Sequence, residues 1–266
     1  MHGSRRNRAL ATAAAALVIA GLATAELLKA QPSQEGGRGH AVEAVVAPRP
    51  APKPAAAATR PTPTPAVPAP TLIATLKAAL AYRQLPGGPV AGTLPATNPF
   101  GAPEVLAVVG RPSASGWAQV ELPIRPNGSR GWIPVADVTM SATSYQVVVN
   151  VAADTVTVTD AGRLVLTTAA AVGKPSTPTP TGHTYLWELI RPDDPNGAYG
   201  PYIFGLGWFS NAYAVFNGGD AQIGIHGQDE PSSVGHPVSH GCVRVENPVI
   251  SQLAGMLPLG TPVTIV

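Results

Sequence analysis

The sequence contains few cysteine, aromatic and charged residues. Cys242 is the one cysteine among 266 residues, aromatic residues make up 5% of the chain and charged residues 12%. A single cysteine excludes an internal disulfide, so its thiol is either an inert buried group or a reactive one. The formal net charge of +2 does not provide the dense basic surface that neutralises a nucleic-acid backbone, and we expect no nucleic-acid partner.

Residues 1–28 have the pattern of an export signal. Three arginines between positions 5 and 8 precede an uncharged run at residues 9–25, which is the order of the basic and apolar regions in signal peptides. Ala23-Thr24-Ala25 offers small residues to a signal peptidase, but the run is also nearly long enough to stay in the cytoplasmic membrane as an anchor. The sequence predicts an exported chain and leaves both outcomes open for this segment.

Residues 29–70 are dominated by alanine and proline. Prolines recur at every second position in residues 48–54 and 61–65, which is typical of an extended, semi-rigid linker. The short apolar stretches that follow at residues 71–141 are broken by glycine and proline and predict a small β domain. The segments around Trp117 and Trp132 resemble those of bacterial SH3-like wall modules, and we expect both tryptophans in its core.

Residues 142–266 predict a second domain that is mainly β and carries a short C-terminal helix. Apolar residues alternate with other residues from Tyr145 to Val151, as on one face of a half-buried strand. Asp160-Ala161-Gly162 separates two β-rich runs and is typical of a hairpin turn. Asn247 is expected to cap the helix, with Pro248 at its first position.

Three histidines and the cysteine lie close together in one segment, as His226, His236, His240 and Cys242. Structural zinc sites usually have more than one cysteine, and we expect neither a metal nor a cofactor. A thiol needs a neighbouring base to become a thiolate, and the loop after His226 allows Cys242 to return beside it. The turn Ser239-His240-Gly241 offers successive backbone N–H groups to an oxyanion. Together these residues predict acyl transfer.

The motif resembles the signature of the YkuD-type L,D-transpeptidases. Twelve residues separate His226 from the run Ser-His-Gly-Cys, and Arg244 stands two positions after the cysteine. Gly173-Lys174-Pro175 and the segment 179–182 are also similar to that family, so the likeness covers about residues 144–266. It implies a YkuD-like β-sandwich catalytic domain, preceded here by the small SH3-like β domain.

The resemblance also implies roles for individual residues. Cys242 is the nucleophile, His226 the general base, and Gly227 the third member of the site through its backbone carbonyl, which fixes the imidazole tautomer. Ser239, His240 and Gly241 form the oxyanion turn, while Arg244 either supports the loop or binds a substrate carboxylate. His236 matches nothing fixed in the family and is expected in a loop.

By the same resemblance, the partners are donor and acceptor stem peptides of peptidoglycan, in the cell wall or at the outer face of the cytoplasmic membrane. Cys242 would attack the carbonyl before a terminal D-alanine, and a second stem would resolve the thioester into a cross-link. Water in place of that stem gives an L,D-carboxypeptidase, and attachment of a wall protein is a third outcome. A non-catalytic wall-binding protein is the alternative from another class. Residues 193–216 are expected to form a lid that sets selectivity.

Overall fold

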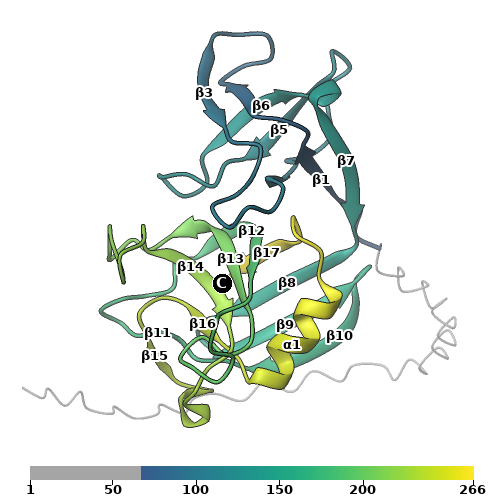
Figure 1. Ribbon diagram of the computed structural model, residues 1–266. Coiled ribbons are helices and arrows are strands. Elements are labelled where there is room, and N and C mark those ends of the chain that lie inside the picture. The colour runs from purple at the N-terminus through teal and green to yellow at the C-terminus, as the bar shows by residue number, and fades with distance from the viewer. Residues whose placement is uncertain (1–66) are drawn as a thin grey trace, which may run out of the picture. The chain divides into compact units, whose positions relative to one another are not determined.

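The computed structural model describes residues 67–266, so the predicted export segment and residues 29–66 of the predicted linker lie outside the described part (Figure 1). Strands dominate this part, and the prediction of a mainly β protein with a short C-terminal helix is confirmed. Between residues 67 and 266, no helix combines the length and hydropathy needed to cross a membrane.

Residues 71–143 form two small antiparallel sheets, which we call the N-terminal sheets. One has the strand order β4-β1-β7 and the other the order β3-β2-β6-β5. The strands are β1 (Thr71–Leu76), β2 (Leu80–Arg83), β3 (Val90–Leu94), β4 (Val105–Ala107), β5 (Trp117–Glu121), β6 (Arg130–Pro134) and β7 (Val138–Thr143), with a 3₁₀ turn, η1 (Val135–Asp137), before β7. Their core includes Leu106, Val120 and Ile133, none of which is exposed.

The expected core position of Trp117 and Trp132 is wrong. Both side chains are half-buried, and the Arg83 guanidinium lies 5.7 Å from the centre of the Trp117 ring. Side chains alternate between the two faces of a strand, and Ala118 and Ile133 occupy the inward positions next to the tryptophans. The two indoles are therefore directed away from the core of the N-terminal sheets.

The C-terminal part is built on one eight-stranded sheet with the order β10-β9-β8-β17-β12-β13-β14-β16. Its strands are β8 (Tyr145–Asn150), β9 (Thr155–Asp160), β10 (Arg163–Ala169), β12 (Gly182–Ile190), β13 (Ile203–Phe209), β14 (Gln222–His226), β16 (Val243–Arg244) and β17 (Pro262–Ile265). A separate parallel pair joins β11 (Val172–Gly173) to β15 (Pro237–Ser239). A 3₁₀ turn, η2 (Pro231–Ser233), lies directly before β15. The predicted hairpin turn is confirmed, because Ala161 and Gly162 join β9 to β10 with φ values of 48° and 80°.

One face of this sheet carries the hydrophobic core, and α1 (Asn247–Met256) packs against it (Figure 1). Ile250 and Leu253 of the helix are buried among valines of β8 and β9 and apolar residues of β13 and β14. The expected cap is off by one residue, because Glu246 is the N-cap and Asn247 lies in the first turn. The Asn247 side chain instead accepts a hydrogen bond from Gln228 N–H at 2.8 Å.

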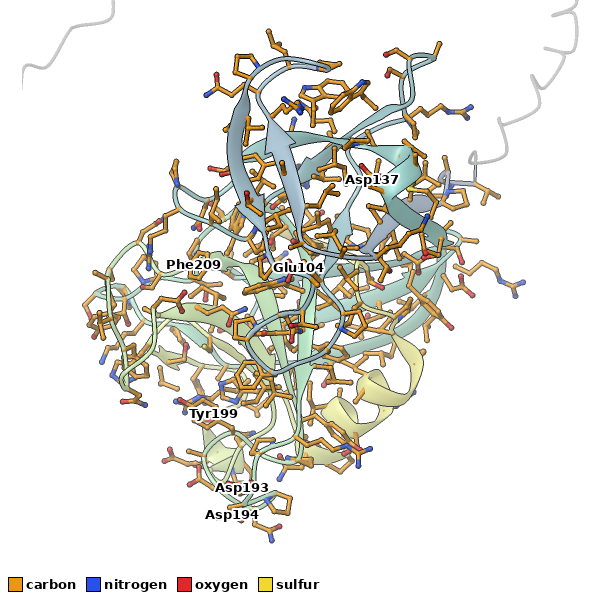
Figure 2. All side chains as sticks on the ribbon, turned by 45° about the horizontal axis from the view of Figure 1, so that its top comes forward. Glu104, Asp137, Asp193, Asp194, Tyr199 and Phe209 are labelled. Carbon is orange, nitrogen blue, oxygen red and sulfur yellow. The ribbon has the colours of Figure 1, made fainter. Side chains whose placement is uncertain are left out.

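The N-terminal sheets and the eight-stranded sheet share part of their core. Tyr185 and Trp187 of β12 belong to the hydrophobic cluster of the N-terminal sheets, with 0% and 8% of their surface exposed. The indole N–H of Trp187 donates to Glu104 at 2.7 Å, and Glu104 lies where the two groups of strands meet (Figure 2). The described residues accordingly belong to one compact unit.

Candidate active site

Strand pairing brings the predicted base and nucleophile to one face of the sheet. Cys242 directly precedes β16, which runs parallel to β14 with Ile225 opposite Val243 and His226 opposite Arg244. Side chains two residues apart on a strand point to the same face, so Cys242 and His226 project from the face opposite to Ile225 and Val243. Those two residues are buried in the core, which leaves the other face to the site.

A cavity of about 540 Å³ lies on this face. His226, His240, Cys242 and Arg244 all line it, so four of the predicted site residues share one cavity. Further walls come from the loops between β12, β13 and β14 and from the N-terminal sheets, and include Phe100, Tyr199, Tyr213, Phe216 and Asp220. The cavity is therefore built from both parts of the described chain.

His226 is held in one orientation by its neighbour Gly227. Its side chain is 2% exposed, and Nδ1 lies 2.5 Å from the Gly227 carbonyl oxygen. A carbonyl only accepts hydrogen bonds, so Nδ1 carries the proton and Nε2 is left free to accept one. Burial lowers the pKa of His226 to about 4; the positive charge of Arg244 acts in the same direction, and the hydrogen bond to Gly227 opposes it. The imidazole is therefore neutral and basic at Nε2.

Gly227 is fixed by close packing as well as by this hydrogen bond. A side chain at Gly227 would collide with Asn247 Oδ1 and would approach the Cα atom of Gly200 to 3.0 Å. Asn247 in turn accepts the N–H of the next residue, Gln228. The first turn of α1 thus positions the carbonyl that orients the His226 ring, whereas the sequence pattern predicted only a capping role for Asn247.

Cys242 presents a neutral thiol to the cavity. Burial raises the pKa of Cys242, while a hydrogen bond with the Gly224 backbone and the charge of Arg244 oppose part of the rise. With His226 also neutral, the resting pair holds its proton on sulfur. A thiol beside a neutral imidazole can give up this proton as it attacks a carbonyl, as a serine hydroxyl does beside its histidine.

Internal hydrogen bonds stabilise the turn before Cys242. Ser239 is fully buried; its hydroxyl donates to the Cys242 carbonyl at 2.6 Å and accepts the Gly241 N–H at 3.0 Å. The hydroxyls of Thr177 and Thr179 donate to the carbonyls of Ser239 and Gly241. Since the Gly241 N–H is already engaged, the N–H groups of His240 and Cys242 are the candidates for an oxyanion. Gly241 has a φ of 126°, which favours glycine.

Aromatic rings lie beside the two histidines that line the cavity. The Tyr199 ring lies 5.0 Å from the His226 ring in an edge-on arrangement, and the Phe216 ring lies 5.4 Å from the His240 ring. Only part of the predicted lid is involved, because Asp193 and Asp194 lie at the end of the loop away from the N-terminal sheets (Figure 2). The segment from Ala198 to Gln222 supplies most of the covering residues instead.

The remaining predicted residues divide between cavity and surface. Arg244 is half-buried and lines the cavity, and its backbone exchanges two hydrogen bonds of 2.8 Å with Ala171. His236 is exposed in the loop before β15, where its carbonyl accepts from Val172 and Val238. Within residues 67–266, no group of three or more histidine, cysteine or acidic residues is placed to hold a metal ion.

Sequence reasoning missed two functional candidates in this region. Glu188 lines the cavity although it is 0% exposed. The sequence feature that could have identified it is one acidic residue within the apolar run of β12. Arg125 belongs to the N-terminal sheets, and its guanidinium donates to the carbonyls of Ser210, Tyr213 and Asp220. No local pattern marks Arg125, because its partners are 85 or more positions away.

A family model for the L,D-transpeptidase catalytic domain, YkuD, matches residues 144–265. The matched segment covers slightly less than half of the chain and contains the predicted motif. The protein named YkuD in Bacillus subtilis (strain 168) is 37% identical over 121 residues, which is 46% of this chain and 65% of that protein. Its counterpart in Bacillus licheniformis is 36% identical over the same shares. The chain thus spans slightly less than two thirds of the length of these curated relatives.

Solved structures with similarity to this chain include L,D-transpeptidases. The enzyme from Enterococcus faecium is 24% identical with a TM-score of 0.36, covering 46% of this chain and 50% of that chain. L,D-transpeptidase 3 from Mycobacterium tuberculosis is 13% identical with a TM-score of 0.40, covering 61% and 91%. The segment that matches the family model includes every residue of the predicted motif, from His226 to Arg244.

Proposed function

We propose that the chain is an L,D-transpeptidase that cross-links peptidoglycan stem peptides through a thioester on Cys242. The observation that carries the proposal is the shared cavity, in which the thiol and an imidazole oriented by the Gly227 carbonyl lie on one face of paired strands. The match of residues 144–265 to the YkuD family model supports the same chemistry. The proposal includes export to the cell wall or to the outer face of the cytoplasmic membrane, where stem peptides are found.

In the donor half-reaction, Cys242 Sγ attacks the carbonyl that precedes a terminal D-alanine. The thiol proton moves to His226 Nε2 as the carbon–sulfur bond forms, and the Nδ1–H bond to Gly227 stabilises the resulting imidazolium. The N–H groups of His240 and Cys242 stabilise the oxyanion. The intermediate then collapses, the amine of D-alanine takes the proton from Nε2 and leaves, and a thioester remains.

In the acceptor half-reaction, the side-chain amine of a second stem attacks the thioester carbon. His226 Nε2 takes a proton from the amine, the carbon–sulfur bond breaks, and the proton returns to sulfur. The product is a cross-link between the third residues of two stems. Water in place of the amine releases a shortened stem by the same steps, so an L,D-carboxypeptidase outcome depends on the acceptor and not on different residues.

The test is incubation of the purified chain with tetrapeptide stems, followed by mass spectrometry of the protein and of the products. We expect Cys242 to carry a thioester adduct whose mass is that of the stem without its terminal D-alanine. A cross-linked dimer should then appear among the products. Release of tripeptide without dimer would assign the carboxypeptidase outcome. A chain that binds stems without forming an adduct or a product would instead be a wall-binding protein.

Two substitutions identify the reacting groups. Cys242→Ala should abolish turnover and the adduct, as well as any covalent product with a carbapenem. His226→Gln should lower the rate at least about a hundredfold, the lower end for loss of a general base. His183→Gln is the matched control, because His183 is exposed on β12 and contacts Thr264 rather than the cavity. Equal losses in both histidine variants would remove His226 from the mechanism.

A further inference from the structure

A row of four residues crosses the cavity face of the sheet, from β12 to the start of β16. Glu188 is paired with Gly205, and Gly205 with Gly224. Gly224 lies beside Cys242, since Ile225 and Val243 form the next pair. Residues paired across strands point to the same face, so Glu188 and Cys242 stand at the two ends of one row. Neither residue between them has a side chain.

The two glycines leave the floor of the cavity open between the carboxyl group and the thiol. A Cβ atom at Gly205 would lie 2.6 Å from Nε2 of Gln222 and from both Cγ and Oε1 of Glu188, which is closer than real Cβ atoms come. The Glu188 side chain therefore leans over Gly205, toward Gly224 and Cys242. A Cβ atom at Gly224 would lie 3.1 Å from the Phe204 carbonyl oxygen, so this position is tight for a side chain as well.

The Glu188 carboxyl group lacks the partners that buried polar groups normally have. The residue is 0% exposed, and no hydrogen bond of normal geometry reaches Oε1 or Oε2 among residues 67–266. The Gln222 side-chain amide lies beside this carboxyl group, but its Nε2 donates to the Leu206 carbonyl at 2.9 Å. Glu104, a comparable buried glutamate nearby, receives the Trp187 indole N–H. A buried carboxyl group without a donor is destabilising and requires an explanation. A ligand that brings a donor into the cavity supplies one.

The charges around the cavity indicate what kind of donor fits. Burial raises the pKa of Glu188 to about 7; a hydrogen bond with the Gln222 side chain opposes part of this rise, and the negative charge of Asp220, which also lines the cavity, adds to it. Arg244 lies at the Cys242 end of the row. The Glu188 end therefore favours a cation, and a cation bound there would in turn favour the ionised carboxylate.

On the basis of the proposed function, we propose that Glu188 binds the side-chain ammonium group of the donor stem's third residue while that residue is bonded to Cys242. The lengths agree. The carboxyl group lies over Gly205, two strand spacings from Cys242, or roughly 9.6 Å. The bond to sulfur and the acyl carbon take up part of this distance. A chain of four carbons and a nitrogen spans about 6 Å at ordinary bond lengths and covers the rest.

The test compares two donor tetrapeptides, one with lysine as third residue and one with norleucine, which has the same carbon chain without the amine. Mass spectrometry follows the acylation of Cys242 in the wild type, in Glu188→Gln and in Glu121→Gln. Glu121 is the matched control: it is 6% exposed, burial likewise raises its pKa to about 7, and it does not line the cavity.

We expect the wild type and Glu121→Gln to acylate with the lysine stem at least about tenfold faster than with the norleucine stem at subsaturating concentration, as for a charge-assisted hydrogen bond. In Glu188→Gln the two rates should become equal within about twofold, because the lysine rate falls and the norleucine rate does not. A tenfold preference that survives in Glu188→Gln, or that is missing in the wild type, overturns this inference alone. A wild type that forms no adduct with either stem overturns the proposed function and this inference together.

Discussion

Arg125 connects the N-terminal sheets to the loop that covers the active site. Its guanidinium donates to the carbonyls of Ser210, Tyr213 and Asp220 at 2.8, 3.0 and 2.9 Å, and it lies 5.1 Å from the centre of the Phe209 ring. All three carbonyls belong to the segment that carries the aromatic wall of the cavity. Arg125→Ala removes these contacts without changing any residue of the cavity itself.

The magnitude follows from the number and the exposure of these hydrogen bonds. A hydrogen bond with a charged donor contributes about 1.5–3 kcal/mol in a shielded setting, but two of these three bonds are exposed to water. We therefore assign somewhat less than 1 kcal/mol to each bond and about 2 kcal/mol to the set. That free energy corresponds to an increase of about 30-fold in the open fraction of the loop.

Amide hydrogen exchange measures this opening directly. In Arg125→Ala we expect exchange at residues 210–221 to accelerate by about 30-fold, while amides of β8 and β9 keep their protection. The KM for stem peptides should rise with it, because the wall of the cavity is less often in place. Arg111→Ala is the control, an exposed arginine of the same sheets outside this contact. Unchanged exchange in the loop of Arg125→Ala would refute the reasoning.

Three further expectations concern the base, the buried acids and the shared core. Asp229→Asn and Glu230→Gln should each keep activity within about tenfold, which is roughly 1.4 kcal/mol of activation barrier. Both side chains are exposed, and the Gly227 carbonyl already orients the His226 ring. A thousandfold loss in a folded variant would make that carboxylate the third catalytic group. Burial raises the pKa of Glu121 from 4.5 to about 7. Between these two pH values the Glu121 carboxyl group keeps its proton in the folded chain and has lost it in the unfolded chain. The stability from this group is complete below about pH 4.5 and is lost as the pH rises through 7; urea unfolding at about pH 5 and about pH 8 should show a smaller pH dependence in Glu121→Gln. Deletion of residues 1–143 should reduce the soluble yield although the motif is intact, because two aromatic side chains of β12 lose their cover; a monodisperse product with the wild-type melting temperature would contradict this.

The local features of the site were predictable from sequence because each rests on neighbouring residues. The order of His226, the turn and Cys242 follows from one segment, and the orienting group is the carbonyl of the next residue. The hairpin turn at Ala161 and Gly162 is equally local, since its backbone angles suit glycine and small residues. Sheet content could be read from alternation of apolar residues.

The features that were missed depend on pairings between distant strands. Glu188 faces the cavity because β12 pairs with β13 in a register that shifts between Leu186 and Glu188. A single sequence does not specify which of two faces becomes the core in a strand that is mostly apolar. The half-buried tryptophans were misplaced for the same reason, since the smaller Ala118 occupies the inward position beside Trp117.

The sharing of Tyr185 and Trp187 between two sets of strands also bears on how the chain acquires its structure. About forty residues separate the last of the N-terminal strands, β7 (Val138–Thr143), from these two aromatic residues. During synthesis from the N-terminus, the N-terminal sheets cannot complete their core until β12 has emerged. The early part of the chain therefore waits for the later part, and a homologous small β module grafted in its place would need a surface shaped to receive both rings.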